Sequence, residues 1–375
     1  MKNKKSISSV ILVFMILIVF AFCGKQKPEW GGTIEEVDGV TVVKNPKEPI
    51  YGEGIFGLKD ELTIGKKKGE EEYMFTRLIA IDVDEEGNIY TLDLREGHIK
   101  AFDNNGKYIK TIGKKGQGPG EMQMPYNIHI TPKKEILVND ARARRLLFFS
   151  LDGTFLRQIS TAKMTFFVYP KMNSKGMIVG SKQIPGGLIP GFELLMFDSN
   201  FDLIKTISKI ELPKPPIIEP EIPEFCWEYT QEDNLIWGIP TKYELHVLNM
   251  EGEIIKKIKK DYDPVRVTEE EKEVMKKRFS MEGAPPNIKF EFPQNHLAFV
   301  NLSIDDEGRI FIGTYEKIEN GEGYYYDVFD SEGKYLAKIP LKLEPQVWKK
   351  GNLYTIEEDD EGFQVVKRYK VTWSY

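Results

Sequence analysis

The chain has 375 residues, of which 41% are hydrophobic and 29% are charged, which is ample for a sizeable globular core. Its formal net charge of −6 argues against nucleic acid as a partner, because binding phosphates requires a basic face. Aromatic residues are plentiful, with 22 Phe, 17 Tyr and 5 Trp, and long helical patterns are scarce. This balance favours strands.

The first segment is expected to be a targeting signal. A basic start precedes the apolar run Val10–Phe22, which is too short for a comfortable membrane span and suits a secretory signal. Cys23 follows directly, and the segment resembles the bacterial lipoprotein signal. The resemblance implies a signal peptide over residues 1–22, lipidation of Cys23 and an exported body that is lipid-anchored to a membrane of the cell envelope. Phe22 stands where that family prefers Gly, Ala or Ser, so an uncleaved N-terminal anchor is the alternative.

Processing would change the charge and the thiol content of the chain. Removing residues 1–22 removes three lysines and no acids, so the formal charge goes from −6 to −9. With Cys23 acylated, only Cys226 stays free, which leaves no internal disulfide and no thiolate metal cluster. Residues 23–36 are polar and are expected to form a tether.

A repeated unit of four short strands occupies the rest of the chain. In its first copy, Ile79–Gly113, each strand-like run is bounded by Gly, Asn or Asp. The turn before its last strand, Phe102–Gly106, carries the polar residues and the glycine that a tight hairpin requires. Further copies are Asn127–Ser160, Val168–Ser208, Cys226–Lys259, Val300–Pro340 and Glu344–Val371.

The sixth copy lacks its last strand, because the chain ends after the third. The segment Asp60–Gly65, "DELTIG", matches the "KTIG" ending of an intact copy and supplies the missing strand. We therefore predict an all-β fold over residues 37–375, a six-bladed β-propeller of four-stranded antiparallel blades whose last blade is closed by an N-terminal strand. One short helix is predicted in an inter-blade insertion, Thr268–Phe279, where Thr268 and Glu271 form a capping box.

The stretch "GKKGQGPGEM", Gly113–Met122, is similar to the Gly-Pro-Gly-Glu loop found after the last strand of a blade in the six-bladed propeller lipoproteins of bacteria, which are relatives of NHL-repeat propellers. The resemblance covers residues 50–375. It implies the propeller fold and says little about activity, because much of that group has no assigned function.

The two faces of the predicted ring differ. On one, the short-turn face, lie the brief turns after the first and third strand of each unit. On the other, the long-loop face, lie the middle hairpins and the links between blades, which are long and irregular. Loops on a rigid scaffold are where binding usually occurs. The predicted helix lies in one of these links and is either a solvated cover or a lid that docks a partner.

Aligning the units places five residues at one register near the start of the innermost strand, at the mouth of the central channel on the long-loop face: Asn127, Tyr169, Cys226, Asn301 and Glu344. His129 should point the same way, deeper in the channel. The amide and carboxylate oxygens could hold a divalent cation such as Ca²⁺, and gluconolactonase-type propellers use a similar set. A hydrated channel is the alternative. Trp227 is either blade packing or a stacking platform for a sugar or peptide.

Arg142, Arg144 and Arg145 lie in one hairpin of the long-loop face. Their guanidinium groups could clamp a carboxylate or phosphate. Pairing with the neighbouring Glu121 or Asp140 is the alternative.

The leading interpretation is a tethered propeller that binds a small molecule or a partner protein on its long-loop face, without catalytic residues or a cofactor. One alternative is a metal-dependent hydrolase or lactonase of the gluconolactonase type that uses the mouth residues. Another is a structural component of an envelope assembly.

Overall fold

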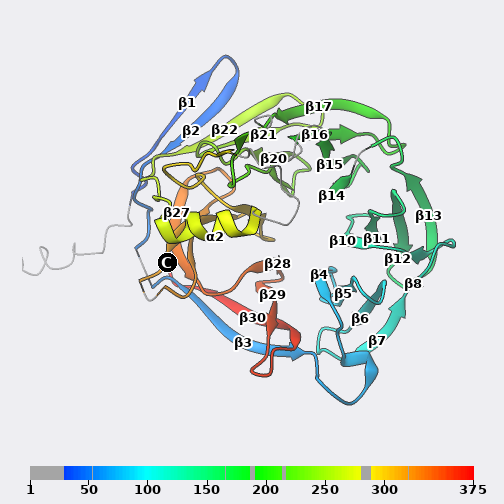
Figure 1. Cartoon of the computed structure of the whole chain (residues 1–375). Coiled ribbons are helices and arrows are strands. Elements are labelled where there is room, and N and C mark those ends of the chain that lie inside the picture. Colours follow the sequence, from blue (N-terminus) through cyan, green and yellow to red (C-terminus); the bar gives the residue numbers. More distant parts are fainter. Residues whose placement is uncertain are drawn as a thin grey trace, which may run out of the picture.

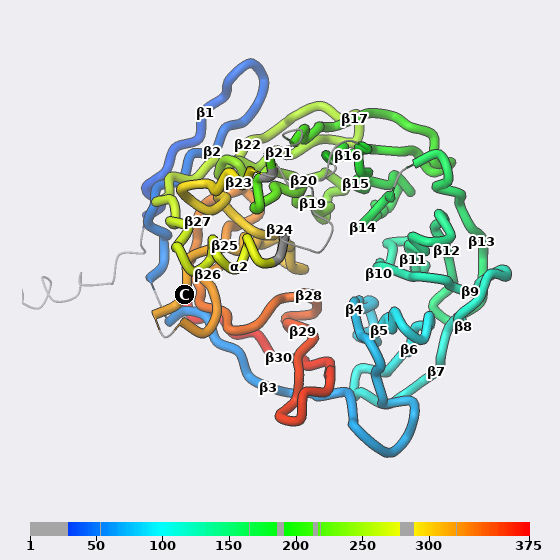
Figure 2. Tube along the Cα trace, in the orientation of Figure 1, coloured from blue at the N-terminus to red at the C-terminus, as the bar shows by residue number. Residues whose placement is uncertain are grey.

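A computed structural model describes residues 29–375 except 53, 165, 186–190, 213–216, 280–288 and 320. The predicted signal peptide and Cys23 lie outside the described residues. Six sheets surround a central channel, which confirms the predicted six-bladed propeller (Figure 1). Figure 2 shows the chain passing from blade to blade around the ring in sequence order.

The first five blades are continuous in sequence, and each orders its strands from the channel outward. Blades 1 and 2 comprise β4 (Leu78–Val83), β5 (Ile89–Asp93), β6 (His98–Phe102) and β7 (Tyr108–Ile112), then β10 (Pro125–Ile130), β11 (Glu135–Asp140), β12 (Arg145–Ser150) and β13 (Phe155–Ser160). Blade 3 comprises β14 (Phe167–Met172), β15 (Ile178–Ile184), β16 (Gly191–Phe197) and β17 (Leu203–Ile210). Blades 4 and 5 comprise β19 (Cys226–Tyr229), β20 (Leu235–Gly238), β21 (Glu244–Leu248) and β22 (Ile254–Lys260), then β24 (Asn301–Ile304), β25 (Ile310–Lys317), β26 (Tyr324–Phe329) and β27 (Tyr335–Leu341).

Blade 6 joins the two ends of the chain. It comprises β28 (Pro345–Lys349), β29 (Asn352–Glu358), β30 (Gln364–Trp373) and, outermost, β3 (Phe56–Ile64). The antiparallel register of β3 and β30 runs from Phe56 opposite Trp373 to Ile64 opposite Val366. The predicted closure by an N-terminal strand is thus confirmed.

The segment before β3 adds a feature that the repeated units do not contain. β1 (Thr33–Val37) and β2 (Val40–Asn45) form a hairpin, and β2 pairs in parallel with β22, so the sheet of blade 4 has six strands. In Figure 1 the hairpin projects beyond the rim of the ring. Strand β1 begins inside residues 23–36, which we expected to be tether. Every residue of β1 is exposed, so the strand has no buried face that could produce a hydrophobic pattern.

Residues 33–64, named here the N-terminal strap, bind three blades together. The side chain of Asn45 is buried and donates through Nδ2 to the carbonyl oxygens of Lys259 in blade 4, at 3.1 Å, and Gly333 in blade 5, at 2.8 Å. Its Oδ1 accepts from the backbone N–H of Tyr335 at 2.7 Å. The chain then follows β27, where the N–H of Ile50 donates to the carbonyl of Tyr335, before it enters blade 6.

The short turns share one capping device. Asp84 Oδ1 accepts the backbone N–H groups of Glu86 and Asn88 at 2.9 and 2.8 Å. The same two bonds are made by Asp103, Asn173, Asp198, Asp305 and Asp359. These carboxylate and amide groups stabilise the turn that connects two strands.

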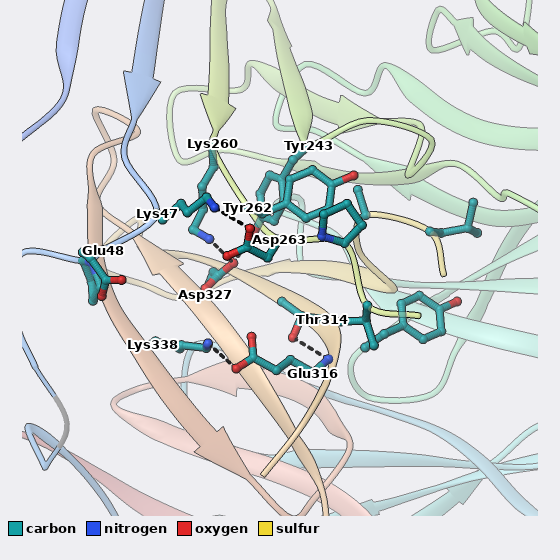
Figure 3. A pocket seen from close by; sticks show the side chains of 16 residues that line it. Lys47, Glu48, Tyr243, Lys260, Tyr262, Asp263, Thr314, Glu316, Asp327 and Lys338 are labelled. Atoms are coloured by element: carbon teal, nitrogen blue, oxygen red, sulfur yellow. Dashed lines mark hydrogen bonds and ion pairs between the residues drawn. The ribbon is translucent and has the colours of Figure 1, made fainter. Parts of the chain in front are cut away.

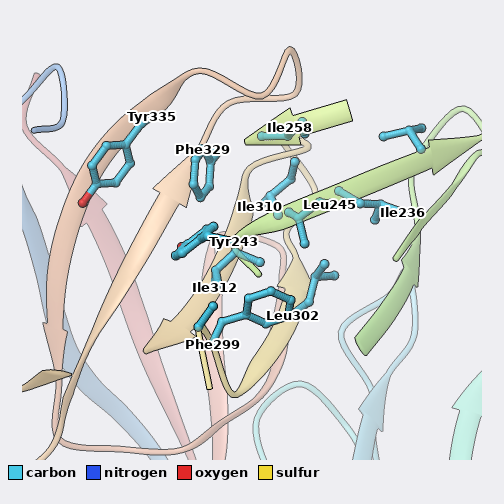
Figure 4. Packing of buried hydrophobic residues seen from close by; sticks show 12 residues of the cluster. Ile236, Tyr243, Leu245, Ile258, Phe299, Leu302, Ile310, Ile312, Phe329 and Tyr335 are labelled. Atoms are coloured by element: carbon cyan, nitrogen blue, oxygen red, sulfur yellow. The ribbon is translucent and has the colours of Figure 1, made fainter. Parts of the chain in front are cut away.

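Turn glycines also pack blade against blade. Gly333 has φ +93°, and a Cβ there would lie 2.6 Å from Cγ1 of Ile258 on the outer strand of the preceding blade. Figure 4 shows the apolar cluster of this interface, with Leu245 and Ile258 from blade 4 against Ile310 and Phe329 from blade 5. Burial of such clusters between all neighbouring blades supplies the main stabilisation of the ring.

Helix α2 (Glu269–Phe279) is the predicted helix, and its capping box is present. Thr268 Oγ1 accepts the N–H of Glu271, and Glu271 Oε2 accepts the N–H of Thr268, at 3.2 and 2.9 Å. Smaller elements complete the described chain: η1 (Glu71–Tyr73), β8 (Lys114–Lys115), β9 (Glu121–Met122), β18 (Ile217–Ile218) and β23 (Lys289–Phe290). None of the helices among the described residues has the length and apolar character needed to cross a membrane.

Candidate functional site

The aligned mouth residues all lie where the innermost strands begin. Asn127 and Tyr169 are the third residues of β10 and β14, Cys226 and Asn301 open β19 and β24, and Glu344 immediately precedes β28. These strands, together with β4, contact one another around the channel. The register read from the repeats therefore places these side chains at one end of the channel.

An aromatic arc follows this mouth from blade 2 to blade 4. The ring centroid of Tyr169 lies 5.8 Å from that of Tyr126 and 6.4 Å from that of Trp227. Trp227 is buried, whereas Tyr169 is 42% exposed. Tyr169 has φ +49°, which a bulky residue seldom adopts, and the pairing of β14 with β15 is irregular there. Trp227 therefore packs the blade, and Tyr169 presents the accessible ring.

A pocket of about 420 Å³ lies in the next part of the mouth, at the end of blade 5 that carries its middle hairpin, and is named here the tyrosine pocket. Its volume is within the range of small-ligand sites. Three tyrosines line it, together with two of the aligned mouth residues and apolar side chains: Tyr315, Tyr324, Tyr326, Asn301, Glu344, Val300, Leu341 and Leu343. Asn127 does not line this pocket, so the three mouth oxygens that we considered for a cation are not gathered in it.

The polar groups of the tyrosine pocket are unequally satisfied. Asn301 Nδ2 donates to the hydroxyl oxygen of Tyr326 at 3.3 Å. Burial raises the pKa of Tyr326, the Asn301 hydrogen bond opposes this, and the negative charge of Glu344 adds to the rise. Within the part of the chain that the structure describes, the Glu344 carboxylate has no hydrogen-bond or ion-pair partner.

A buried histidine supports Tyr315 from behind. The rings of His296 and Tyr315 stack with centroids 4.5 Å apart and planes 7° apart. Each nitrogen of His296 faces a carboxylate, with Nδ1 3.0 Å from Glu221 Oε1 and Nε2 3.3 Å from Glu271 Oε2. Because both ring nitrogens are engaged, His296 holds the wall of the pocket in place.

Helix α2 is attached to blade 5 through Glu271, one of the two carboxylates that face His296. Glu271 Oε1 pairs with Lys317 Nζ at 3.0 Å, and the Thr268 backbone N–H helps to hold the pKa of Glu271 at about 2. Figure 1 shows α2 in front of blade 5. The placement of the helix therefore depends on His296 and Lys317.

A second cavity, of about 400 Å³, lies on the other side of Thr314 and Tyr315, against the N-terminal strap (Figure 3). Apart from Glu48, its charged side chains neutralise one another in pairs: Lys47 with Asp263, Lys260 with Asp327 at 3.3 Å, and Lys338 with Glu316 at 2.5 Å. Asp327 also accepts the hydroxyl groups of Tyr243 and Tyr335. A ligand there would have to break these contacts, so the cavity is less suited to binding.

The channel itself contains a third cavity, of about 570 Å³, which reaches the turns of the short-turn face. His129 lies in it, with Nδ1 3.6 Å from Asp82 Oδ2, and Lys171 pairs with Glu228. Among the described residues, no three His, Cys, Asp or Glu side chains are placed to hold one metal ion.

Comparison with protein families identifies the chain. A model of a domain of unknown function, DUF4934, matches residues 81–360, most of the propeller. The chain belongs to the DUF4934 family. No functionally curated protein matches the sequence.

Solved structures similar to this DUF4934 chain share the fold. A protein described as exported, from Bacteroides fragilis, aligns with a TM-score of 0.57 at 12% identity over 89% of this chain and 100% of its own. A DUF4221 member from Bacteroides vulgatus aligns with a TM-score of 0.55 at 15% identity, over 85% of this chain and 99% of its own. A gluconolactonase from Xanthomonas campestris aligns with a TM-score of 0.45 at 9% identity, over 79% of this chain and 88% of its own. This likeness is too low to bear on activity.

The arginine hairpin of the DUF4934 chain divides into two kinds of residue. Arg145 is largely buried and donates to Asp140 Oδ2 at 3.2 Å and to the carbonyl of Glu121 at 2.7 Å. These are the neighbours with which we considered pairing. Arg142 and Arg144 are exposed, and Arg144 Nη1 donates to the carbonyl of Ala162 at 3.5 Å.

The tyrosine pocket contains residues that the sequence reasoning missed. Tyr315, Tyr324 and Tyr326 lie in the long middle hairpin of blade 5, which was recognised only as a long loop. The pairing of β25 with β26 shifts register between Gly313 and Lys317, so a regular strand pattern does not predict which side chains reach the mouth. The run "GYYYD" was the available signal for Tyr324 and Tyr326.

Proposed function

We propose that this chain is an extracytoplasmic, membrane-tethered binding propeller whose ligand lies on the long-loop face and which has no catalytic role. The tyrosine pocket carries the proposal. It combines a suitable volume, exposed aromatic surface at Tyr324 and polar groups at the channel mouth. Its Tyr315 wall is preorganised by His296, which favours binding because little side-chain freedom is lost.

The chemistry around the mouth supports binding over catalysis. Both nitrogens of His296 face carboxylates, which leaves neither free to accept a proton from a substrate. Burial raises the pKa of the Cys226 thiol to about 12, so the thiolate nucleophile is scarce at neutral pH. His296 and Cys226 are thus occupied or unreactive, which leaves Glu344 as a single carboxylate without a partner group among the described residues.

A ligand screen of the mature protein tests the site. Thermal shift against glycans, peptides and small metabolites should identify compounds that raise the melting temperature. Tyr324→Ala should abolish most of this rise, because it removes an exposed ring of the pocket. The control is Leu203→Ala, which removes an exposed side chain from blade 3. Ligands that bind Tyr324→Ala normally but fail with Leu203→Ala would contradict the assignment.

The tether is tested separately. Cys23→Ser should block signal processing or release the protein from the membrane fraction, because acylation requires the thiol. Normal processing and membrane partition of this variant would refute lipidation at Cys23.

A further inference from the structure

The tyrosine pocket contains an acid without a counter-ion. Glu344 lies at its border, and no described residue forms an ion pair with the carboxylate. The one ammonium group that lines the pocket, Lys342 Nζ, is 2.9 Å from Glu322 Oε2. The charge of Lys342 is therefore balanced outside the pocket, and that of Glu344 is not.

A second carboxylate lies next to the tyrosine pocket. The Glu221 carboxylate lies behind Tyr315, and after burial it is the main influence that raises the pKa of that hydroxyl. Glu221 is itself more than nine-tenths buried, and its Oε2 has no hydrogen-bond partner. Glu344 at the border and Glu221 behind Tyr315 thus place two carboxylates near the pocket, while Tyr315, Tyr324 and Tyr326 provide aromatic surface.

We propose that the tyrosine pocket binds an organic cation, with a substituted or primary ammonium group against the tyrosine rings and Glu344 as its counter-ion. Aromatic rings attract ammonium groups through their electron-rich faces, and tyrosine-lined cages recognise quaternary ammonium ligands in this way. The apolar side chains Val300, Leu341 and Leu343 suit the methyl or methylene groups next to the charge. An anionic ligand would be repelled by Glu344. The inference rests on the proposed function and specifies its ligand class.

Two sources present this chemistry, a free trimethylammonium compound and a lysine side chain of a peptide. Titration of the mature protein, followed by NMR chemical shifts or calorimetry, separates them. The probes are choline, Nα-acetyl-lysine amide and 3,3-dimethylbutan-1-ol, the neutral isostere of choline. We expect at least one cation to bind at least tenfold more tightly than the isostere, and the tighter cation identifies the source.

Variants locate the bound cation. Glu344→Gln should raise its Kd at least tenfold, and Tyr324→Ala should do the same, whereas both should keep the wild-type melting temperature because the two side chains are exposed. The matched control is Glu251→Gln, which removes the same charge from an exposed short turn of blade 4. Its Kd should be unchanged.

Three outcomes would overturn the inference: equal affinity for choline and its neutral isostere, an equal loss in Glu344→Gln and Glu251→Gln, or no binding of either cation. If neither cation binds but the screen finds a neutral ligand whose binding is abolished in Tyr324→Ala, the tyrosine pocket remains the binding site. Only the proposed ligand class, an organic cation, is then wrong. If no ligand depends on Tyr324, the proposed function fails as well.

Discussion

Tyr169 presents its ring on a strained backbone. Its φ of +49° costs an L-residue about 1–2 kcal/mol, which contacts with Tyr126 and Trp227 must offset. Tyr169→Ala keeps the backbone strain and loses the ring contacts. Tyr169→Gly loses the same contacts and also relieves the strain. After the entropic cost of glycine, of roughly 0.5–1 kcal/mol, Tyr169→Gly should be more stable than Tyr169→Ala by about 0.5 kcal/mol. Urea unfolding measures the difference, and an Ala variant that is equally stable would argue against strain.

The arginines of one hairpin should respond differently to truncation. Arg145→Ala removes buried hydrogen bonds to Asp140 and Glu121 and should lower the free energy of unfolding by about 1–3 kcal/mol. Arg142→Ala and Arg144→Ala alter exposed side chains and should change it by less than about 0.5 kcal/mol. Chemical denaturation of the three variants checks this. Equal effects at all three positions would contradict the structural role of Arg145.

His246 makes stability depend on pH. Its ring stacks on Trp237, and burial lowers its pKa below the usual 6.5. The unfolded chain therefore takes up the proton first, so stability is complete above pH 6.5 and falls as the pH drops below that value. Unfolding monitored by tryptophan fluorescence should show a smaller loss between pH 7 and pH 5 in His246→Phe than in wild type. Parallel pH profiles would rule out His246 as a contributor, since His98, whose pKa is also lowered, is present in both.

At the scale of elements, the N-terminal strap depends on one side chain. Asn45→Ala would leave the N–H of Tyr335 and the carbonyls of Lys259 and Gly333 without their buried partner. The expected loss is at least about 3 kcal/mol, because three groups lose their partner and each unsatisfied buried group costs about 1–3 kcal/mol. Calorimetry of Asn45→Ala should show the loss. The control is Lys44→Ala, at the neighbouring exposed position. An equal change in both variants would contradict the bridging role of Asn45.

The strands were predictable where local chemistry determines them. The Asp84 and Asp103 turns, the β3 strand and the α2 capping box each have a sequence signature a few residues long. The β1–β2 hairpin has one too, the Asp38–Gly39 turn, whose residues have φ +51° and +77°, but the hairpin lies outside the repeated units and was therefore missed. The tyrosine pocket depends on how β25 and β26 are offset and on His296, which comes from a distant link. Such contacts arise from tertiary packing, which a repeat alignment does not contain.

At the scale of the whole molecule, closure of the ring should depend on β3. Deleting residues 37–65 removes β2 and β3, including Ile64, which is buried between blades 6 and 1. We expect aggregation or a marked fall in melting temperature, because β30 becomes an open edge. Deleting only residues 29–45 should lower the melting temperature less, because β3 stays in place. Size-exclusion chromatography and thermal unfolding test both, and a monomeric 37–65 deletion with unchanged melting temperature would disprove closure by β3.

The pairing of Phe56 with Trp373 also sets an order of events in time. A ribosome makes β3 among the first strands and its partner β30 last, so a growing chain can complete five blades at most while the ring stays open. Bringing such distant segments together is slow, since contacts between remote parts of a chain form late. A chain that crosses a membrane from its N-terminus would meet the same delay on the far side. Ring closure therefore marks the moment at which the strands of all six blades have arrived.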